Sequence, residues 1–319
     1  MDGQHERFPG GEFGMIARFA ARVGAPPPPA GPGDDAAVLP EPHGRIVATT
    51  DLLVEGVHFR TDWSSAADIG HRAAAANLAD VAAMGAAPTA LLIGVALPAD
   101  LPPTFVDGFA DGLRDECAPL GVRIVGGDTV RSPDRITVAI TALGELRGHR
   151  PVTRGGARPG DDVVLVARVG WAAAGLSWLQ EHAGEPPPVW APFVTAHRRP
   201  RPPYDAGPAL ARVGAHALCD VSDGLVADAG HLAAASEVGI ELDSAALRDR
   251  ALDAVRDSGS PPTWELTGGD DHALLAAVPA GLELGELAEV RRIGRVVAGR
   301  GVRVDGRELA SGGYEHFGG

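Results

Sequence analysis

Aspartate recurs in six short segments of this 319-residue chain, four of which are glycine turns, and the chain contains no lysine. The segments are Gly33-Asp34-Asp35, Thr49-Thr50-Asp51, Asn77 to Asp80, Gly126-Gly127-Asp128, Asp220 to Gly224, and Gly268-Gly269-Asp270-Asp271. Carboxylates and hydroxyls are the ligands that hard cations prefer. Without lysine, a Walker-type lysine, a kinase-type strand lysine and a Schiff base are all excluded. A nucleotide bound here would therefore need metal ions and arginines to offset its phosphate charge.

Charge and composition exclude several classes of partner. The formal net charge of −14 argues against nucleic acid and against an anionic membrane surface. Two cysteines, Cys117 and Cys219, show neither zinc-site spacing nor a disulfide framework. No apolar run approaches the roughly 18 residues of a membrane span, and the N-terminus lacks the pattern of a signal peptide. We therefore expect a cytoplasmic protein with no nucleic-acid and no membrane partner.

Hydrophobic periodicity predicts two domains, 1–148 and 149–319, of α+β and α/β type, with the Gly, Arg and Pro-rich segment 147–160 at their boundary. In the first we expect helices at 12–23, 66–84 and 105–120, and strands at 36–39, 45–50, 89–96, 122–125 and 136–143. In the second we expect strands at 163–167, 217–221, 239–242, 273–278 and 293–297, helices at 172–182, 205–214 and about 247–258, and a helix opening at 222–224. A proline-rich stretch, 186–203, separates two of these helices.

The acidic segments favour a cation site, each weakly alone and more strongly together. Asn77 and Asp80 are three residues apart and share one face of an alanine-rich helix, where an unpaired aspartate is costly. The run 49–51 follows a strand and suits a magnesium site. Ser222 is a natural N-cap before a helix N-terminus that favours phosphate. Simple capping or a buried structural aspartate would explain each segment singly. The oxygen-rich ligand set disfavours zinc, and no Gly-x-Ser-x-Gly elbow is present.

Taken in order, these motifs resemble the thiamine-monophosphate kinases, a family of the aminoimidazole-ribonucleotide synthetase-like ATP-binding superfamily. The matching stretches run from Gly33-Asp34-Asp35 through Thr49-Thr50-Asp51, His58-Phe59, Asn77 to Ala86, Gly126 to Thr129, Thr153 to Ala157, Asp220 to Leu225 and Thr267 to Asp271, and end at Gly313 to Phe317. The set is specific, whereas no single member is.

The resemblance implies a fold, a reaction and a set of roles. The N-terminal α+β sheet domain would pair across a homodimer, and the C-terminal domain would be α/β. ATP would phosphorylate thiamine monophosphate directly, giving thiamine diphosphate, with several Mg²⁺ ions and no catalytic acid or base. The implied magnesium ligands are Asp34, Thr49, Thr50, Asp51, Asp80, Asp128, Asp220 and Asp223. The implied ATP contacts are Gly127, Asp128, Arg154 and Ser222, and the implied substrate contacts are His58, Asp270 and Tyr314.

Two positions depart from the family pattern. Asp270 stands where the family usually has glutamate, and Tyr314 where it has tryptophan. Aspartate is one methylene shorter, whereas tyrosine keeps an aromatic face for stacking.

Three alternatives remain open at this point. One is another ATP-dependent member of the superfamily, a cyclase or a selenophosphate-forming enzyme, although the latter would be expected to carry a cysteine near its N-terminus and the first here is Cys117. The second is a non-catalytic homologue that binds metal and nucleotide. The third is a calcium-binding structural protein, against which the chain has no Asp-x-Asp-x-Asp-Gly loop.

Overall fold

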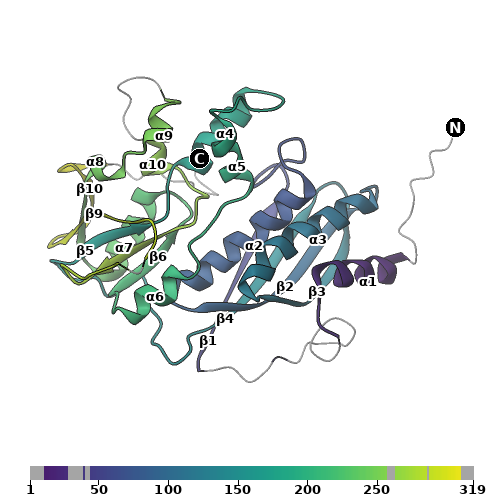
Figure 1. The fold of residues 1–319 in the computed structure, drawn as a ribbon, viewed down its shortest axis with the longest axis horizontal. Coiled ribbons are helices and arrows are strands. Elements are labelled where there is room, and N and C mark those ends of the chain that lie inside the picture. The colour runs from purple at the N-terminus through teal and green to yellow at the C-terminus, as the bar shows by residue number, and fades with distance from the viewer. Residues whose placement is uncertain (1–10, 28–38, 40–43, 257–262, 286, 310–319) are drawn as a thin grey trace. The chain divides into compact units, whose positions relative to one another are not determined.

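The computed structural model describes residues 11–27, 39, 44–256, 263–285 and 287–309, and the structural statements below concern these residues. Asp34, Tyr314 and residues 36–38 of the predicted strand 36–39 lie outside them. The chain divides into two compact units, residues 1–81 with 88–145, and residues 82–87 with 146–319 (Figure 1). None of the described helices is long and apolar enough to cross a membrane.

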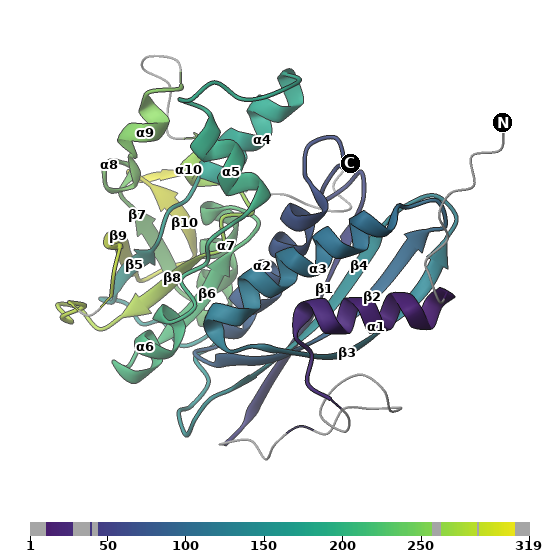
Figure 2. The same ribbon diagram turned by 45° about the vertical axis from the view of Figure 1, so that its right-hand side comes forward.

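The first unit is a four-stranded sheet with helices against one face. Its elements are α1 (Gly11–Val23), β1 (Ile46–Val54), α2 (Ala66–Ala83), β2 (Ala87–Pro98), α3 (Pro103–Cys117), the 3-10 turn Ala118–Leu120, β3 (Arg123–Ser132) and β4 (Thr137–Glu145). The strand order is β1-β4-β2-β3, with β1 antiparallel to β4 and β2 parallel to β3. Helices α2 and α3 cover one face, and α1 lies beside α3 (Figure 2). Ion pairs Arg18–Asp107 and Arg22–Asp111 join α1 to α3.

Alternation along β1 decides which side chains meet α2. Leu53 is buried and Asp51 and Thr49 are half-buried on one face, whereas Thr50 and Leu52 are exposed on the other. This is the period of two that a strand with one covered face requires. Helix α2 is nearly all buried and alanine-rich, so its backbone approaches the sheet closely. The polar residues of β1 and α2 are thereby placed on facing surfaces.

The second unit is a seven-stranded mixed sheet with order β11-β10-β7-β9-β5-β8-β6. Its strands are β5 (Asp162–Val166), β6 (Ala217–Val221), β7 (Gly239–Leu242), β8 (Ala273–Val278), β9 (Val290–Val297), β10 (Gly301–Val304) and β11 (Arg307–Glu308). Its helices are α4 (Trp171–Glu181), α5 (Ala191–Arg198), α6 (Ala206–Arg212), α7 (Leu225–Ser236), α8 (Ser244–Leu247), α9 (Arg250–Asp253) and α10 (Thr263–Thr267). Every pair of neighbouring strands is antiparallel except β7–β10. Strands β5, β6 and β8 are buried throughout, and α7 packs on one face of the sheet.

The predicted combination of an α+β and an α/β domain is confirmed, but three local predictions are wrong and helix α5 was not predicted. Gly126-Gly127-Asp128 is not a turn, because β3 continues through it; an irregularity in the β2–β3 register falls at Val125, just before the first glycine. The proline-rich stretch 186–203 contains helix α5, which tolerates Pro192 in its first turn. The helix expected near 247–258 is, as far as residue 256, two short helices, α8 and α9. Ser222 does not cap α7, whose N-cap is Gly224. Strands β10 and β11 and helix α10 were not predicted.

Candidate functional site

The first unit gathers polar atoms where β1 faces α2. The Thr49 hydroxyl donates a hydrogen bond to Asp80 Oδ2 at 2.8 Å. The fully buried Asn77 accepts the Asp51 backbone N–H through Oδ1 at 3.1 Å and donates through Nδ2 to the Ala73 carbonyl at 2.9 Å. Two carboxylates and one hydroxyl, all half-buried, thus lie on facing surfaces of a strand and a helix. The predicted grouping of Thr49, Asp51 and Asp80 is present in the geometry.

Two other predicted residues of this region are placed differently. The Thr50 side chain lies on the opposite face of β1, where its hydroxyl donates to the Ile140 carbonyl at 3.0 Å. Its hydroxyl therefore does not lie on the face of β1 that meets Asp80. His58 follows β1, and its Nδ1 accepts the Val54 N–H at 3.0 Å. That bond assigns the neutral ring's proton to Nε2, which makes Nε2 a hydrogen-bond donor.

Asp128 lies on β3 at the rim of an apolar cavity of about 110 Å³. Helices α1 and α3 and strands β2, β3 and β4 form its walls, with Phe19 and Phe109 among the lining side chains. Asp128 itself is exposed and accepts the Thr129 N–H at 2.9 Å. Gly127 has a packing reason to be glycine, because a Cβ there would lie 1.9 Å from the Ile93 carbonyl oxygen.

In the second unit, two acidic glycine turns, Asp220–Gly224 and Gly268–Asp271, pack backbone against backbone. The Asp270 N–H donates to the Ser222 carbonyl at 2.9 Å, and the His272 N–H donates to the Val221 carbonyl at 3.0 Å. A Cβ at Gly269 would lie 2.3 Å from the Ser222 oxygen. Asp270 and His272 both have left-handed backbone, with φ of 68° and 52°, which is unfavourable for residues other than glycine. The backbone hydrogen bonds between the two turns hold these unfavourable conformations in place.

The buried Asp220 lies at the end of β6 and is paired across the two turns. Its Oδ2 is 3.2 Å from His272 Nδ1, and both side chains are nearly inaccessible. Ser222 and Asp223 follow in the loop between β6 and α7 and are half-buried. The predicted residues Asp220, Ser222, Asp223 and Asp270 therefore come together in one place.

Asp228 organises this loop and was missed in the sequence. Its Oδ2 accepts three backbone N–H groups, those of Ser222, Asp223 and Gly224, at 3.1 to 3.2 Å. The side chain is 1% exposed. Burial first, and then the charge of Asp220, raises the pKa of Asp228 to about 7. Its position one helical turn after Gly224 is the only sequence signal that could have found it.

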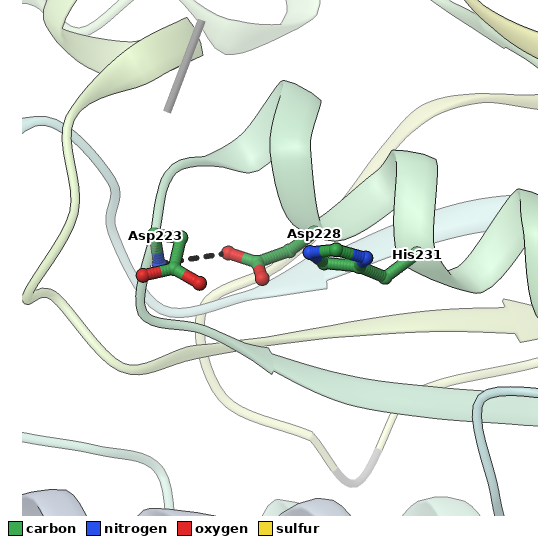
Figure 3. Close-up of side chains that lie close together, drawn as sticks. All are labelled: Asp223, Asp228 and His231. Carbon is green, nitrogen blue, oxygen red and sulfur yellow. Dashed lines mark hydrogen bonds between the residues drawn. The ribbon is translucent and has the colours of Figure 1, made fainter. Parts of the chain in front are cut away.

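Asp223, Asp228 and His231 form a group whose ligand atoms all lie within 4.8 Å of one another (Figure 3). Asp228 and His231 lie on the same side of α7, three residues apart, and Asp223 approaches from the preceding loop. The group has the size and donor chemistry to hold a divalent cation. His231 was not predicted.

Arg154 lies in the segment before β5. Ser236, at the end of α7, holds this segment through hydrogen bonds. The Ser236 hydroxyl accepts the N–H groups of Gly156 and Ala157 at 3.1 Å and donates to the Arg154 carbonyl at 3.0 Å. The Arg154 side chain is exposed, as a phosphate contact requires.

Both thiols are unsuited to nucleophilic chemistry. Burial raises the pKa of Cys117 to about 12 and that of Cys219 well above 9. The thiolate fraction at neutral pH is therefore negligible, in line with the expectation that catalysis uses no cysteine.

The buried Asp271, next to Asp270, leads us to expect that the free energy of unfolding depends on pH. Its carboxylate accepts the N–H groups of Gly170 and Ala172 at 2.5 and 2.9 Å, and burial raises its pKa to about 7. The folded state binds this proton more tightly than the unfolded state, so the stability it contributes is present at low pH and is lost as pH rises through 7. In metal-free buffer, urea unfolding from pH 5 to 8 should therefore show stability falling with pH by up to about 1.4 kcal/mol per unit from this group.

In the Asp271→Asn variant, the free energy of unfolding should fall less steeply with pH. Asp305→Asn is the matched control, because hydrogen bonds from Ser244 lower the pKa of Asp305 below this range, so it should keep the parent's slope. An unchanged slope in Asp271→Asn would show that Asp271 is ionised throughout.

Comparison with known proteins gives two family models and close relatives. Residues 33–146 match the AIR synthase related protein N-terminal domain, and residues 158–307 match its C-terminal domain. Thiamine-monophosphate kinase of Mycobacterium tuberculosis is 42% identical over 97% of this chain and 92% of its own length. That of Escherichia coli K12 is 37% identical over 84% of this chain and 83% of its own length.

Solved structures agree with the relatives. The thiamine-monophosphate kinase from Stenotrophomonas maltophilia K279a superposes with a TM-score of 0.83 at 33% identity, covering 93% of this chain and 98% of that chain. AaThiL complexed with AMPPCP and TMP superposes with a TM-score of 0.81 at 34% identity, covering 96% and 97%. With both domain models and full-length relatives matched, the chain belongs to the AIR synthase related family and, within it, to the thiamine-monophosphate kinases.

Proposed function

We propose that this protein transfers the γ-phosphoryl group of ATP to the phosphate of thiamine monophosphate, yielding thiamine diphosphate and ADP. The observation that carries the proposal is the packing of the Asp220–Gly224 loop on the Gly268–His272 turn, which gathers Asp220, Ser222, Asp223 and Asp270. The relatives named above support it, as does the related structure that was solved with AMPPCP and TMP.

The reaction needs charge neutralisation more than acid or base chemistry. An oxygen of the acceptor phosphate, already anionic, bonds to the γ-phosphorus while the bond from γ-phosphorus to the β,γ-bridging oxygen breaks. No proton has to move. Two unit charges 4 Å apart repel by about 4 kcal/mol at an effective dielectric of 20, and this repulsion is the barrier to bringing two polyanions together. Positioning and electrostatic stabilisation therefore supply the catalysis.

Mg²⁺ fits the donor atoms that both units offer. Thr49, Asp51 and Asp80 supply hydroxyl and carboxylate oxygens in the first unit, and Asp220 and Asp223 do so in the second. We add the carboxylate of Asp228 to the second set, on the geometry of Figure 3, where His231 lies beside it. The proposed ligands also include Asp34, Asp128 and the backbone carbonyl of Thr50. The ion, when bound, neutralises phosphate charge that no lysine in this chain could offset.

The remaining residues contact the organic ligands in this proposal. Arg154, Gly127 and Ser222 contact ATP with Asp128, and the Nε2–H of His58 donates to the phosphate of thiamine monophosphate. Asp270 and Tyr314 contact the thiamine moiety. Asp228 also has a positioning role, because its three hydrogen bonds hold the backbone of the loop that carries Ser222 and Asp223.

One assay separates this function from its alternatives. ADP release is measured with Mg²⁺ and ATP, with and without thiamine monophosphate, and thiamine diphosphate is identified by chromatography. ADP and thiamine diphosphate should appear together, in equal amounts, only when thiamine monophosphate is present. ADP release that ignores thiamine monophosphate would indicate another ATP-dependent member of the family. Absence of turnover together with retained nucleotide binding would indicate a non-catalytic homologue.

We further propose a homodimer formed through the open face of the first unit's sheet. On that face, large apolar side chains are exposed: Leu52 by 56%, Ile46 by 53%, Val130 by 52% and Leu92 by 37%. An apolar patch of this kind on a sheet face is typical of a protein–protein interface. A C2 pairing would bury the same patch on both copies.

Leu52→Asp should therefore convert the protein to a monomer. A C2 interface would carry the introduced charge on both copies, and removing these charges from water is costly. Multi-angle light scattering at micromolar concentration should show twice the 32.7 kDa chain mass for the parent and one chain mass for the variant. Val213→Asp, at an exposed apolar residue after α6, should remain dimeric. A monomeric parent would refute the proposed dimer.

A further inference from the structure

The second unit holds a cavity of about 550 Å³ that the proposed phosphoryl transfer does not use. It lies among the end of β5, the start of α4, helix α5 and the arginine-proline segment 199–203 that follows α5. Its volume falls in the range of sites for small organic molecules, roughly 300 to 1,000 Å³. The cavity therefore has room for far more than an inorganic ion.

Three arginines line this cavity in a chain whose net charge is −14. Arg168 stacks on Trp171, with its guanidinium carbon 4.4 Å from the ring centroid, and lies 3.6 Å from Glu289. Arg199 is half-buried, and Arg201 is exposed and makes no hydrogen bond or ion pair within the described ranges. Guanidinium groups bind phosphate oxygens in a bidentate manner, so the cavity favours an anion of that type.

The backbone presents the arginines rigidly. Arg199 and Arg201 each precede a proline, Pro200 and Pro202, and a residue before proline is restricted to extended conformations. Such preorganisation lowers the entropy lost on binding. The helix and prolines of the stretch 186–203, which the transfer reaction leaves without a role, thus build one wall of the cavity.

Backbone strain is concentrated on the opposite wall. Ala167 and Glu289 have φ of 75° and 55°, and the Ala167 N–H donates to the Glu289 carbonyl at 3.2 Å. Both residues line the cavity. Left-handed alanine and glutamate cost free energy, and such strain gathers at ligand-binding sites. The remaining acidic group, Asp271, already accepts two backbone N–H groups from the α4 terminus.

From the arginines, the volume and the rigid apolar wall, we infer that this cavity binds an organic phosphate, without a metal ion. Two kinds of ligand have that chemistry: a thiamine phosphate and an adenine nucleotide. The inference stands apart from the proposed function, because it concerns binding in the absence of Mg²⁺ and of turnover.

Calorimetric titration in excess EDTA tests the inference, because EDTA removes the cation through which the carboxylates would hold phosphates, and the arginine variants below then report on this cavity. Thiamine monophosphate and ADP are titrated separately. Inorganic phosphate is titrated as a comparison that lacks an organic ring. One or both organic phosphates should bind with one site per chain, and the tighter of the two identifies the source. Raising the salt concentration should weaken the binding.

Arg201→Gln and Arg199→Gln should each weaken that binding at least tenfold. Arg201 is exposed, so its replacement leaves the fold intact even if Arg199→Gln does not. Arg300→Gln is the matched control, an exposed arginine between β9 and β10, and should change affinity less than twofold. The inference is overturned by the absence of binding in EDTA, by equal losses in Arg201→Gln and Arg300→Gln, or by inorganic phosphate binding as tightly as the organic phosphates. Failure of the proposed function would appear separately, as missing thiamine diphosphate in the ADP-release assay.

Discussion

Removing divalent cations should reduce ATP-dependent formation of thiamine diphosphate at least a thousandfold. The chain has no lysine to neutralise the transferred phosphate, and its candidate sites present carboxylates that would repel both substrates without a cation. Initial rates are measured after dialysis against EDTA and again after graded addition of Mg²⁺. Full activity should return with the metal.

The control for this experiment is a measurement showing that the fold is unchanged when the metal is removed. Far-UV circular dichroism should be the same with and without EDTA, because the two sheets and their cores contain no metal-dependent element. Added Mg²⁺ should raise the midpoint of thermal unfolding, since an ion that binds only the folded state stabilises it. Undiminished turnover in excess EDTA would eliminate the proposed carboxylate–magnesium chemistry.

Elements with a strong local pattern could be predicted from the sequence closely. The strand Ala217–Val221 was predicted at the bounds that the structure has, and α2 differs by one residue. In both cases a continuous or periodic apolar pattern ends at a clear signal, the aspartate loop after β6 and Gly85 after α2. The shared face of Asn77 and Asp80 followed from helical spacing alone, and both residues do face β1.

Elements whose local signal conflicts with tertiary packing could not be predicted. Prolines in 186–203 concealed α5, although Pro192 occupies a first-turn position that has no need of an N–H donor. Two glycines suggested a turn at 126–127, yet the parallel pairing with β2 carries the strand through them. The tight approach to Ile93 requires glycine there, and this requirement is a property of the sheet.

The core of the candidate site depends on contacts that sequence spacing does not reveal. Ser222 was predicted as the N-cap, but the buried Asp228 holds the loop amides instead, from inside the helix. The pairing of Asp220 with His272 joins residues 52 positions apart. Only the folded chain shows that the motif at 268–271 packs on the motif at 220–224.

Asp80→Asn should lower kcat at least a hundredfold and raise the Mg²⁺ concentration needed for half-maximal activity. Asparagine keeps the size of the side chain and can still accept the Thr49 hydroxyl, so the packing of β1 on α2 is retained. What is lost is one negative charge beside Asp51, on a half-buried surface where such charges hold a cation. A hundredfold loss corresponds to about 3 kcal/mol of transition-state stabilisation.

Asp68→Asn is the matched control for this prediction, because it makes the same charge change on the same helix. Asp68 lies half-buried in the first turn of α2, where it accepts the Ser65 N–H at 3.0 Å. Its replacement should leave kcat and the Mg²⁺ dependence within twofold of the parent, with at most a small loss of stability from the weakened helix terminus. Thermal unfolding of both variants separates catalytic from structural loss. Near-parental kcat for Asp80→Asn at ordinary Mg²⁺ would assign Asp80 to the β1–α2 contact alone and remove it from the proposed metal site.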